Sequence, residues 1–481
     1  MNAFRLTLIA AAVATLIAPT VHAAATEFDN FTPMTGNTTP QNPGSATPYK
    51  LSSPNFSQQT IADRKTQTTL VPGSNSGSWD MIAANETGPN AGRYLFMPFE
   101  TGTGGVQRID LWDNNYNTRT TTIVAPGTNG FVAGDASRWT PWGGYLTAEE
   151  SWGAGSSKGR LFEVTNPTTA AANSGNFIQR TILPRVSHEG LTFDKNNNLY
   201  FVDELNGGSV YKYVSANPFA TNGNDFFAAG QTFALRVGAG GQFEGNNAPA
   251  ITGASSWEAI TDVNGGVLAG VSALLGDGTI DGRVSADNAA VKGTGFNRPE
   301  DMEIQNLVNG NQLLYFTTTD SDDDGNTATG RSRVYSIDLG TSEVKLFADS
   351  NTIDMATGLA AGGEFKNADN LAIDAEGNIY IVEDQDGGVE DVWFAKDENR
   401  DGVAESIAKW ISLTTAGAES TGLYFDKFNP NKAYINVQHP TDGIDRTVML
   451  TAAPAAVPVP GAVWLFGSAL AGMIGLRRRK A

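Results

Sequence analysis

The chain has 481 residues, enough for one large or two ordinary domains, with no cysteine and a formal net charge of −19. The lack of cysteine excludes disulfides and thiolate chemistry, so stability must come from a sizeable core or from bound ions. The acidic balance argues against nucleic acid as a partner and favours hard cations, although an acidic surface can also simply keep a secreted protein soluble.

The first 23 residues have the pattern of a secretory signal peptide. Arg5 is followed by a largely apolar run over residues 6–18, and Val21-His22-Ala23 is a small-x-small cleavage pattern. No twin arginine precedes the run. The sequence therefore predicts export by the general secretory route, removal of the segment by signal peptidase, and a location in the cell envelope or outside the cell.

Residues 24–77 are predicted to form a leader. Up to residue 60 the chain is rich in Thr, Asn, Pro, Ser and Gln, which is typical of a poorly ordered segment or of an extended closing strand. Over residues 78–450 short β-type runs alternate with Gly, Asn and Asp turns, and long amphipathic helical periods are scarce. These residues are predicted to form one all-β domain.

A weak internal repeat indicates how the strands are organised. Residues 190–204 contain an apolar strand, an Asp/Asn turn, a second apolar strand and an acidic end. Residues 370–384 repeat this order closely, and looser copies span residues 301–320 and 422–439. Repeated hairpins at unequal spacing predict a β-propeller, and the number of hairpin units suggests six blades. A β-sandwich array is the alternative.

Acidic residues recur at two positions of this repeat, directly before the first strand and directly after the second. The first set contains Glu189, Glu300 and Asp369, and the second contains Asp203-Glu204, Asp320 and Glu383-Asp384. Equivalent positions of successive blades converge at one end of a propeller channel, where several carboxylates repel one another. We therefore expect Ca²⁺ or another hard ion there. For any single position, a turn-forming role is the simpler explanation.

Two acidic loops begin like calcium-binding loops. Their candidate ligands are Asp397, Asn399 and Asp401 before Gly402, and Asp320, Asp322 and Asp324 before Gly325. The twelfth position, where a bidentate Glu is expected, holds Ala408 and Arg331 respectively. Each loop could be a shortened structural calcium site or an acidic surface turn.

The C-terminal end, residues 457–481, has the order of a sorting tail. A Val-Pro-Val-Pro stretch precedes the uncharged residues 461–476, and residues 477–480 are Arg-Arg-Arg-Lys. As a helix the uncharged run spans about 24 Å, slightly short of a hydrocarbon core of about 30 Å. The tail resembles PEP-CTERM sorting tails of Gram-negative bacteria, which implies recognition by an exosortase-type enzyme and anchoring in the inner membrane until processing. A buried C-terminal helix is the alternative.

Six short segments, in order, resemble the PhoX-type alkaline phosphatases over about residues 90–440. They are residues 140–150 (TPWGGYLTAEE), 188–190 (HEG), 297–301 (NRPED), 369–371 (DNL), 419–422 (ESTG) and 436–440 (NVQHP). The resemblance implies a six-bladed propeller that hydrolyses phosphomonoesters with calcium and iron at the channel mouth. It adds to the prediction made above from the acidic strand ends.

Carried over by motif, Arg298 and Glu300 are the candidate catalytic residues, with Arg298 clamping the substrate phosphate through its planar fork of donors. Glu189 and Glu300 would be metal ligands. The weaker candidates for the remaining ligands are Glu149 or Glu150, Asp203 or Glu204, and Asp369. The cations would neutralise phosphate charge and supply or orient the attacking oxygen.

One departure from the family concerns Ala148, which stands where the family carries an iron-ligating cysteine. A methyl group cannot coordinate a metal, so we expect Ca²⁺ and place Fe³⁺ in doubt. The open outcomes are a calcium-only phosphatase, an oxygen-ligated iron site, and a propeller without catalysis. The last would be a calcium-stabilised protein of the extracellular matrix, and a propeller hydrolase acting on lactones is a further alternative. We expect the protein to be a monomer.

Overall fold

The computed structural model describes residues 26–36, 38–40, 46–151, 155–245, 248–319, 332–384 and 390–454. The predicted signal peptide, the predicted sorting tail and the loop with Asp320, Asp322 and Asp324 lie outside the described residues. In the described ranges, none of the helices has the length and apolar character needed to cross a membrane.

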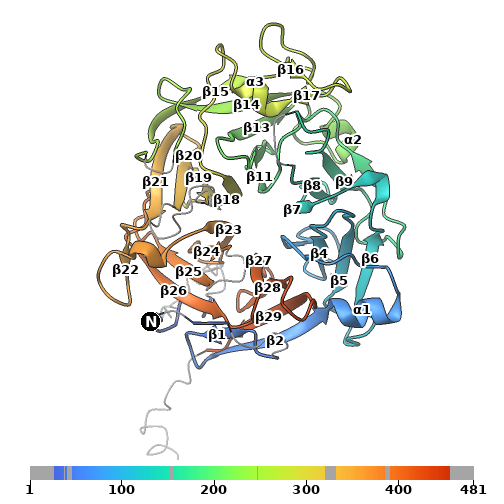
Figure 1. Ribbon diagram of the computed structural model, residues 1–481, viewed down its shortest axis with the longest axis vertical. Helices are drawn as coiled ribbons and strands as arrows, with labels where there is room; N and C mark the ends of the chain where they lie inside the picture. Colours follow the sequence, from blue (N-terminus) through green and yellow to red (C-terminus); the bar gives the residue numbers. More distant parts are fainter. Residues whose placement is uncertain are drawn as a thin grey trace, which may run out of the picture.

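The protein is an all-β propeller whose sheets surround a central axis (Figure 1). One four-stranded sheet contains β3 (Ala83–Ala84), β4 (Tyr94–Pro98), β5 (Val106–Asp110) and β6 (Thr120–Val124). The next contains β7 (Gly134–Trp139), β8 (Tyr145–Glu149), β9 (Leu161–Val164) and β10 (Phe177–Gln179). Both are antiparallel meanders, in which each strand pairs with the next along the chain.

A nine-stranded sheet follows, and it joins two such meanders. The first is β11 (Leu191–Phe193), β12 (Leu199–Val202), β13 (Val210–Ser215) and β14 (Gly230–Val237). The second is β18 (Pro299–Asn306), β19 (Gln312–Thr318), β20 (Arg333–Asp338) and β21 (Glu343–Asp349). Strand β15 (Gly253–Ala259) pairs with both β14 and β21, so the two meanders share one sheet. The count of six blades stays a prediction.

Two further sheets complete the ring. One contains β23 (Ala368–Ile373), β24 (Ile379–Glu383), β25 (Asp391–Lys396) and β26 (Ser406–Leu413), with β1 (Tyr49–Leu51) and β22 (Ile353–Asp354) on β26. The other contains β27 (Glu419–Phe425), β28 (Lys432–Gln438), β29 (Arg446–Ala452) and β2 (Phe56–Asp63). Outside the blades, β16 (Ala273–Leu274) pairs with β17 (Ile280–Asp281). The described helices are short: α1 (Arg64–Leu70), α2 (Gly223–Phe226), α3 (Gly282–Ala286) and the 3₁₀ turns Thr128–Gly130 and Gly362–Glu364.

Strand β2 closes the ring by pairing with the last strand of the chain. Its residues pair antiparallel with β29, from Phe56 opposite Ala452 to Asp63 opposite Arg446. Asp63 then caps α1, because its carboxylate accepts a 2.7 Å hydrogen bond from the Thr66 backbone N–H. The boundary predicted at residue 78 therefore lies inside the fold.

The two closest copies of the sequence repeat form hairpins with the same hydrogen bonds. Asp194 accepts a hydrogen bond from the backbone N–H of Asn198 at 2.8 Å and another from the Tyr200 hydroxyl at 3.2 Å. Residues 374–380 repeat both contacts, at 2.9 and 3.2 Å. The aspartate thus fixes the turn and also satisfies a tyrosine buried in the strand.

Apolar side chains fill the space between neighbouring blades, where strands of alternating pattern face one another. Phe28, from the N-terminal segment, packs edge-on against Trp410 of β26 at 5.5 Å between ring centroids, and Tyr380 of β24 lies 4.5 Å from Phe425 of β27. Burial of each such side chain stabilises the fold by about 2–3 kcal/mol. The innermost strands also approach closely, since a Cβ on Gly190 would lie 2.5 Å from the backbone nitrogen of Met302.

Candidate active site

One acidic side chain lies within three residues of the start of each innermost strand. These residues are Asp80 before β3, Asp135 in β7, Glu189 before β11, Glu300 in β18, Asp369 in β23 and Glu419 in β27. All are buried except Glu419, which is partly exposed. The innermost strands surround the axis of the ring (Figure 1).

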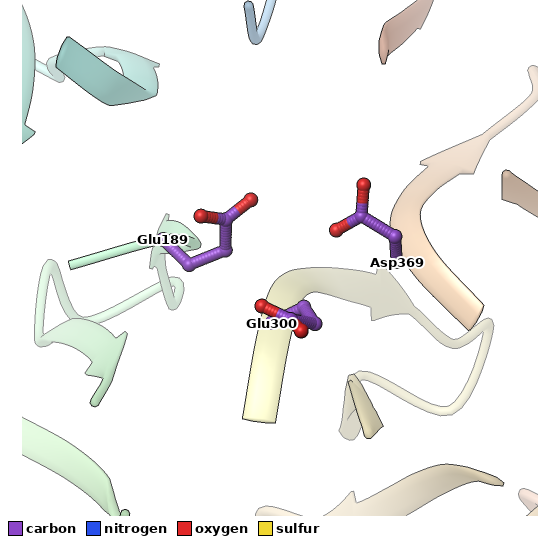
Figure 2. A group of neighbouring side chains, drawn as sticks. All are labelled: Glu189, Glu300 and Asp369. Atoms are coloured by element: carbon purple, nitrogen blue, oxygen red, sulfur yellow. The ribbon is translucent and has the colours of Figure 1, made fainter. Parts of the chain in front are cut away.

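The tightest group is Glu189, Glu300 and Asp369. Figure 2 shows their carboxylates turned towards a common space, and each offers an oxygen within 4.8 Å of the others. Register shifts fall at Glu300 in β18 and at Asp369 in β23, where the chain forms irregular, bulge-like pairs. Such bulges re-aim side chains, which explains how buried strands deliver carboxylates to the axis.

A second layer of acids follows the second strand of the hairpins: Glu100, Glu150, Glu204 and Asp384. One backbone hydrogen bond recurs there. It joins an N–H one or two residues after the second strand to the carbonyl two residues before the first-strand acid: Glu100 to Ser78 (2.8 Å), Glu150 to Ala133 (2.9 Å), Glu204 to Ser187 (2.9 Å), Thr319 to Arg298 (3.0 Å) and Asp384 to Asn367 (2.9 Å). The acidic layers are therefore built by repeated backbone geometry.

The crowding of buried acids shifts their proton equilibria. Burial raises the pKa of Asp80 to about 7 and that of Glu300 to about 8, and the charges of Glu150 and Asp384 contribute to both shifts. Burial followed by neighbouring acids also raises the pKa of Glu100, Asp135, Glu189, Glu204, Asp369, Glu390 and Glu419. After burial, the charge of Asp135 is the largest contribution to the raised pKa of Glu189. Bound cations would replace the protons on these acids.

Arg298 provides a positive charge next to these acids. Its Nη2 donates to Glu204 Oε1 at 2.7 Å, and its Nε lies 3.3 Å from Glu300 Oε1. Burial lowers the pKa of Arg298, but the carboxylates of Glu300 and Glu204 raise it overall. The backbone has φ = 52°, a left-handed conformation that is uncommon for arginine. Such strain persists at sites where the surroundings fix the residue.

In each of the two predicted pairs of adjacent acids, one side chain belongs to the acidic group and the other lies in the interior of a blade. Glu150 and Glu204 lie in the acidic group, because the charge of Glu150, after burial, raises the pKa of Glu204. Glu149 instead accepts a 2.7 Å hydrogen bond from Arg160 Nε, and Asp203 accepts one from the Ser187 backbone N–H at 2.8 Å. The structure therefore brings Glu150 and Glu204 to the site with the triad of Glu189, Glu300 and Asp369, and it places Glu149 and Asp203 elsewhere.

Ala148 and His188 lie in the interior of the blades. Ala148 is fully buried and belongs to an apolar cluster with Leu146 and Leu161. His188 is fully buried, and neither of its ring nitrogens has a hydrogen-bond partner among the described residues. Burial, with a contribution from Arg283, lowers the pKa of His188 to about 3, so the ring is neutral.

The loop with Asp397, Asn399 and Asp401 is held by its own backbone. Asp397 accepts hydrogen bonds from the N–H groups of Asp401 at 3.1 Å and Gly402 at 2.9 Å, and Asn399 accepts one from Asp401 at 2.9 Å. In the described part of the chain, the loop is not among the acidic groups with metal-ligand spacing. Calcium binding by this loop stays a prediction.

Sequence reasoning did not assign Asp80, Glu100, Asp135 or Glu390 to the site. Asp80 and Asp135 stand where Glu189 stands in its hairpin, directly before an apolar run. That shared position was the available signal. It was missed because the hairpins of β3–β4 and β7–β8 have turns unlike the Asp/Asn turn that revealed the repeat.

Comparison with known proteins agrees with this geometry. Fold and site together define a β-propeller with an axial centre of buried carboxylates. The family model for alkaline phosphatase PhoX matches residues 130–441, and the chain belongs to this family. A search of curated proteins gave no match.

Among solved structures, Pseudomonas fluorescens PhoX in complex with vanadate, a transition state analogue, has 15% sequence identity and a TM-score of 0.60. The match covers 86% of this chain and 98% of that one, and it shows a shared fold. The PQQ-bound aldose sugar dehydrogenase of Streptomyces coelicolor has 11% identity, coverage of 82% and 98%, and a TM-score of 0.38. A structural genomics protein from Bacteroides thetaiotaomicron has 13% identity, coverage of 82% and 76%, and a TM-score of 0.39. The last two carry no functional argument.

Proposed function

We propose that this protein is an exported, metal-dependent phosphomonoesterase in which Arg298 binds the substrate phosphate. The observation that carries the proposal is the approach of Glu189, Glu300 and Asp369 to within 4.8 Å beside an arginine, in a chain of the PhoX alkaline phosphatase family. Three buried carboxylates so close to one another are costly unless protons or cations balance them.

The donor set fits a hard cation. The carboxylate oxygens of the triad are the ligands that Ca²⁺ prefers, and the second-layer acids offer more of the same type. Thiolate ligation has no support here, because Ala148 faces apolar side chains. When bound, such cations neutralise the charge of the phosphate and lower the pKa of a coordinated water.

The role of Arg298 follows from its contacts. Its guanidinium is held from two sides by Glu204 and Glu300, which fixes the direction of its donors. A phosphate monoester would exchange for part of these contacts and accept charge-assisted hydrogen bonds from the planar fork. Since charge on the equatorial phosphoryl oxygens must be stabilised during transfer, a fixed arginine contributes to the rate as well as to binding.

The proposed location rests on the sequence. The signal peptide of residues 1–23 and the tail of residues 457–481 support export by the general secretory route, followed by membrane anchoring and processing by an exosortase-type enzyme. The substrates would then be phosphomonoesters outside the cytoplasm. The acidic composition supports the absence of nucleic acid as a partner.

The test is phosphate release from 4-nitrophenyl phosphate by the purified chain with added Ca²⁺, and then with Fe³⁺ as well. We expect turnover with Ca²⁺ and a loss of at least about a hundredfold in Arg298→Ala. Arg236→Ala is the matched control, because Arg236 lies on β14, the fourth strand of its meander, and forms a partly exposed ion pair with Glu258. Turnover no higher than that of Arg298→Ala under every metal condition would remove the enzymatic proposal.

A second candidate is a non-catalytic propeller stabilised by calcium. It is favoured by Ala148, which replaces the cysteine expected from the family resemblance and is packed among apolar side chains. This candidate predicts a large thermal stabilisation by Ca²⁺ without hydrolysis. Gain of iron binding and activity in Ala148→Cys would show that the rest of the site is competent for catalysis.

A further inference from the structure

Both terminal segments of the described chain are bonded to one residue, Asn431, in the turn between β27 and β28. The Glu27 N–H donates to the side-chain oxygen of Asn431 at 2.7 Å. The Ala452 N–H donates to the backbone carbonyl of Asn431 at 3.0 Å. The chain therefore enters and leaves the propeller at the same place.

This turn lies at the opposite end of the propeller from the acidic group. Strand β27 begins with Glu419, which pairs with Gln438 at the end of β28. The Gln438 amide donates to Glu100 Oε2 at 2.8 Å, so this end of the hairpin lies among the acids. Asn431 directly precedes β28 and lies at the other end. The seven residues of β27 span about 20 Å, so both terminal segments leave the propeller about that far from the acids.

The predicted sorting tail starts close to the last described residue. Six residues, 455–460, separate Pro454 from the uncharged run of residues 461–476. Six residues reach at most about 22 Å even when they are fully extended. If the acidic end faced the bilayer, these residues would have to run the full height of a strand, about 20 Å, before they met the membrane. A tail inserted in the membrane therefore holds the end of the propeller near Asn431 against the bilayer.

We call this end of the propeller the distal face. It is formed by the turns between the first and second strands and between the third and fourth strands of the meanders, because both kinds of turn lie at the strand ends opposite the acids. Large apolar side chains are exposed on five of these turns: Trp112, Phe219, Val308, Val403 and Phe428. Aromatic and apolar side chains of this kind favour the interface between membrane and water.

The charges of the distal face do not attract it to lipid strongly. Lys427 pairs with Glu86 at 2.7 Å, and Lys396 pairs with Glu398 at 2.9 Å. Contact with a membrane would therefore come from the apolar side chains. Weak contacts are sufficient for a tethered protein, because the tether keeps the effective concentration of the membrane surface high.

We propose that the distal face rests on the membrane that holds the tail, so that the acidic group points away from the bilayer until the tail is processed. The partner is a lipid surface, and the exposed apolar side chains of the distal face make the contacts. The inference rests on the membrane anchoring in the proposed function and adds the orientation of the anchored protein. Phosphomonoesters in solution would then reach the acidic group from the side that faces away from the bilayer.

The absence of cysteine allows this orientation to be measured with single introduced thiols. Val308→Cys places a fluorescent label on the distal face. Asn206→Cys places one at the acidic end, since Asn206 lies two residues after Glu204, and both positions are exposed. The full chain is incorporated in vesicles of phosphatidylethanolamine and phosphatidylglycerol that contain spin-labelled lipid. We expect both labelled proteins to float with the vesicles, with a loss of fluorescence at residue 308 and none at residue 206.

Two exposed phenylalanines at opposite ends of the propeller test the apolar contacts. Phe219→Ser removes a ring from the distal face. Phe243→Ser is the matched control, because Phe243 is exposed at the acidic end, next to Gly207 in the loop after Glu204. Phe219→Ser should reduce the quenching at residue 308, and Phe243→Ser should leave it unchanged. Equal quenching in the two variants would contradict the proposed contacts.

Flotation and quenching separate this inference from the proposed function, and neither depends on phosphate release. A chain that does not float with the vesicles would contradict the anchoring and the orientation together. Flotation with equal quenching at residues 206 and 308, or with quenching at residue 206 alone, would overturn the orientation only. Protection of residue 308 from iodide without quenching by the lipid would assign the distal face to a second copy of the chain, and the proposal would fail.

Discussion

The Nδ1 atom of His439 lies 3.3 Å from the carbonyl oxygen of Gly417. Glu419 pairs with Gln438, so by register Gly417 faces Pro440, which has no N–H to donate. In the tautomer with a proton on Nδ1, the imidazole supplies the missing donor. Its Nε2 lies 2.8 Å from Glu419 Oε2, and a proton held by either atom joins the imidazole to the acidic group.

Replacement of His439 tests whether its imidazole donates to the Gly417 carbonyl in place of the N–H that Pro440 lacks. His439→Ala should lower the free energy of unfolding by about 1 kcal/mol and weaken Ca²⁺ binding, because Glu419 loses its partner. His439→Asn should retain most of the stability, since an amide can donate to Gly417 and asparagine tolerates the φ of 36° found here. Urea unfolding and calcium titration measure the two effects, and equal losses in both variants would contradict the explanation.

The adjacent acids Glu149 and Glu150 should respond in opposite ways to neutralisation. Glu149→Gln breaks the buried pair with Arg160 and should destabilise the fold by about 3 kcal/mol with little change in calcium affinity. Glu150→Gln removes a repulsive charge, so it should raise the melting temperature without metal and reduce the stabilisation gained from Ca²⁺. Scanning calorimetry with EDTA and with Ca²⁺ distinguishes them. Similar changes in melting temperature for the two variants, with and without Ca²⁺, would contradict the prediction that the two residues lie in different environments.

Without metal, the protein should lose stability as pH rises. In the unfolded chain Asp80 and Glu300 titrate near pH 4, whereas in the folded chain their pKa values are about 7 and about 8. Between these limits the folded state binds more protons, so the stability present below pH 4 is lost progressively up to about pH 8. Thermal unfolding in EDTA should therefore show a lower midpoint at pH 8.5 than at pH 5.5. Saturating Ca²⁺ should remove most of this difference, and a rise with pH in EDTA would refute the expectation.

Asp194 and Asp374, which fix the turns of the two repeated hairpins, should stabilise the fold and take no part in ion binding. Asp374→Ala leaves the Tyr380 hydroxyl and the Asn378 amide without their acceptor, so we expect a loss of about 2–4 kcal/mol of stability. Asp374→Asn keeps an acceptor oxygen and should lose less. Neither variant should change the calcium midpoint, because the turn lies away from the acidic group. Urea unfolding together with calcium titration checks both statements, and a shifted midpoint would connect the turn with the ion site.

The sequence was sufficient to predict a propeller because the hydrogen bonds of the repeated hairpins are local. Asp194 and Asp374 each fix a turn within a few residues, and such chemistry appears as a repeat. The pairing of β15 with two meanders could not be predicted, since it joins segments that share no pattern. The role of β2 was left open between a disordered leader and a closing strand, because composition does not specify a pairing partner.

For the site, the sequence predicted where acids would gather but not which of two neighbours would face the axis. Adjacent residues of a strand point to opposite faces, and a bulge reverses that alternation locally. The irregular pairing around Asp135, Glu300 and Asp369 decides the outcome, and it has no signature in a single sequence. The same reason explains why Glu149 and Asp203 could not be separated from Glu150 and Glu204 in advance.

The pairing of β2 with β29 also determines when the ring can close during synthesis of the chain. The C-terminal sheet receives its fourth strand from residues near the start of the chain, so the ring stays open until residue 452 can meet residue 56. Glu419 belongs to this C-terminal sheet, and Asp80 precedes the first strand of the β3–β6 sheet by three residues. Closure of the ring is therefore a late event in folding, because it needs residues from both ends of the chain.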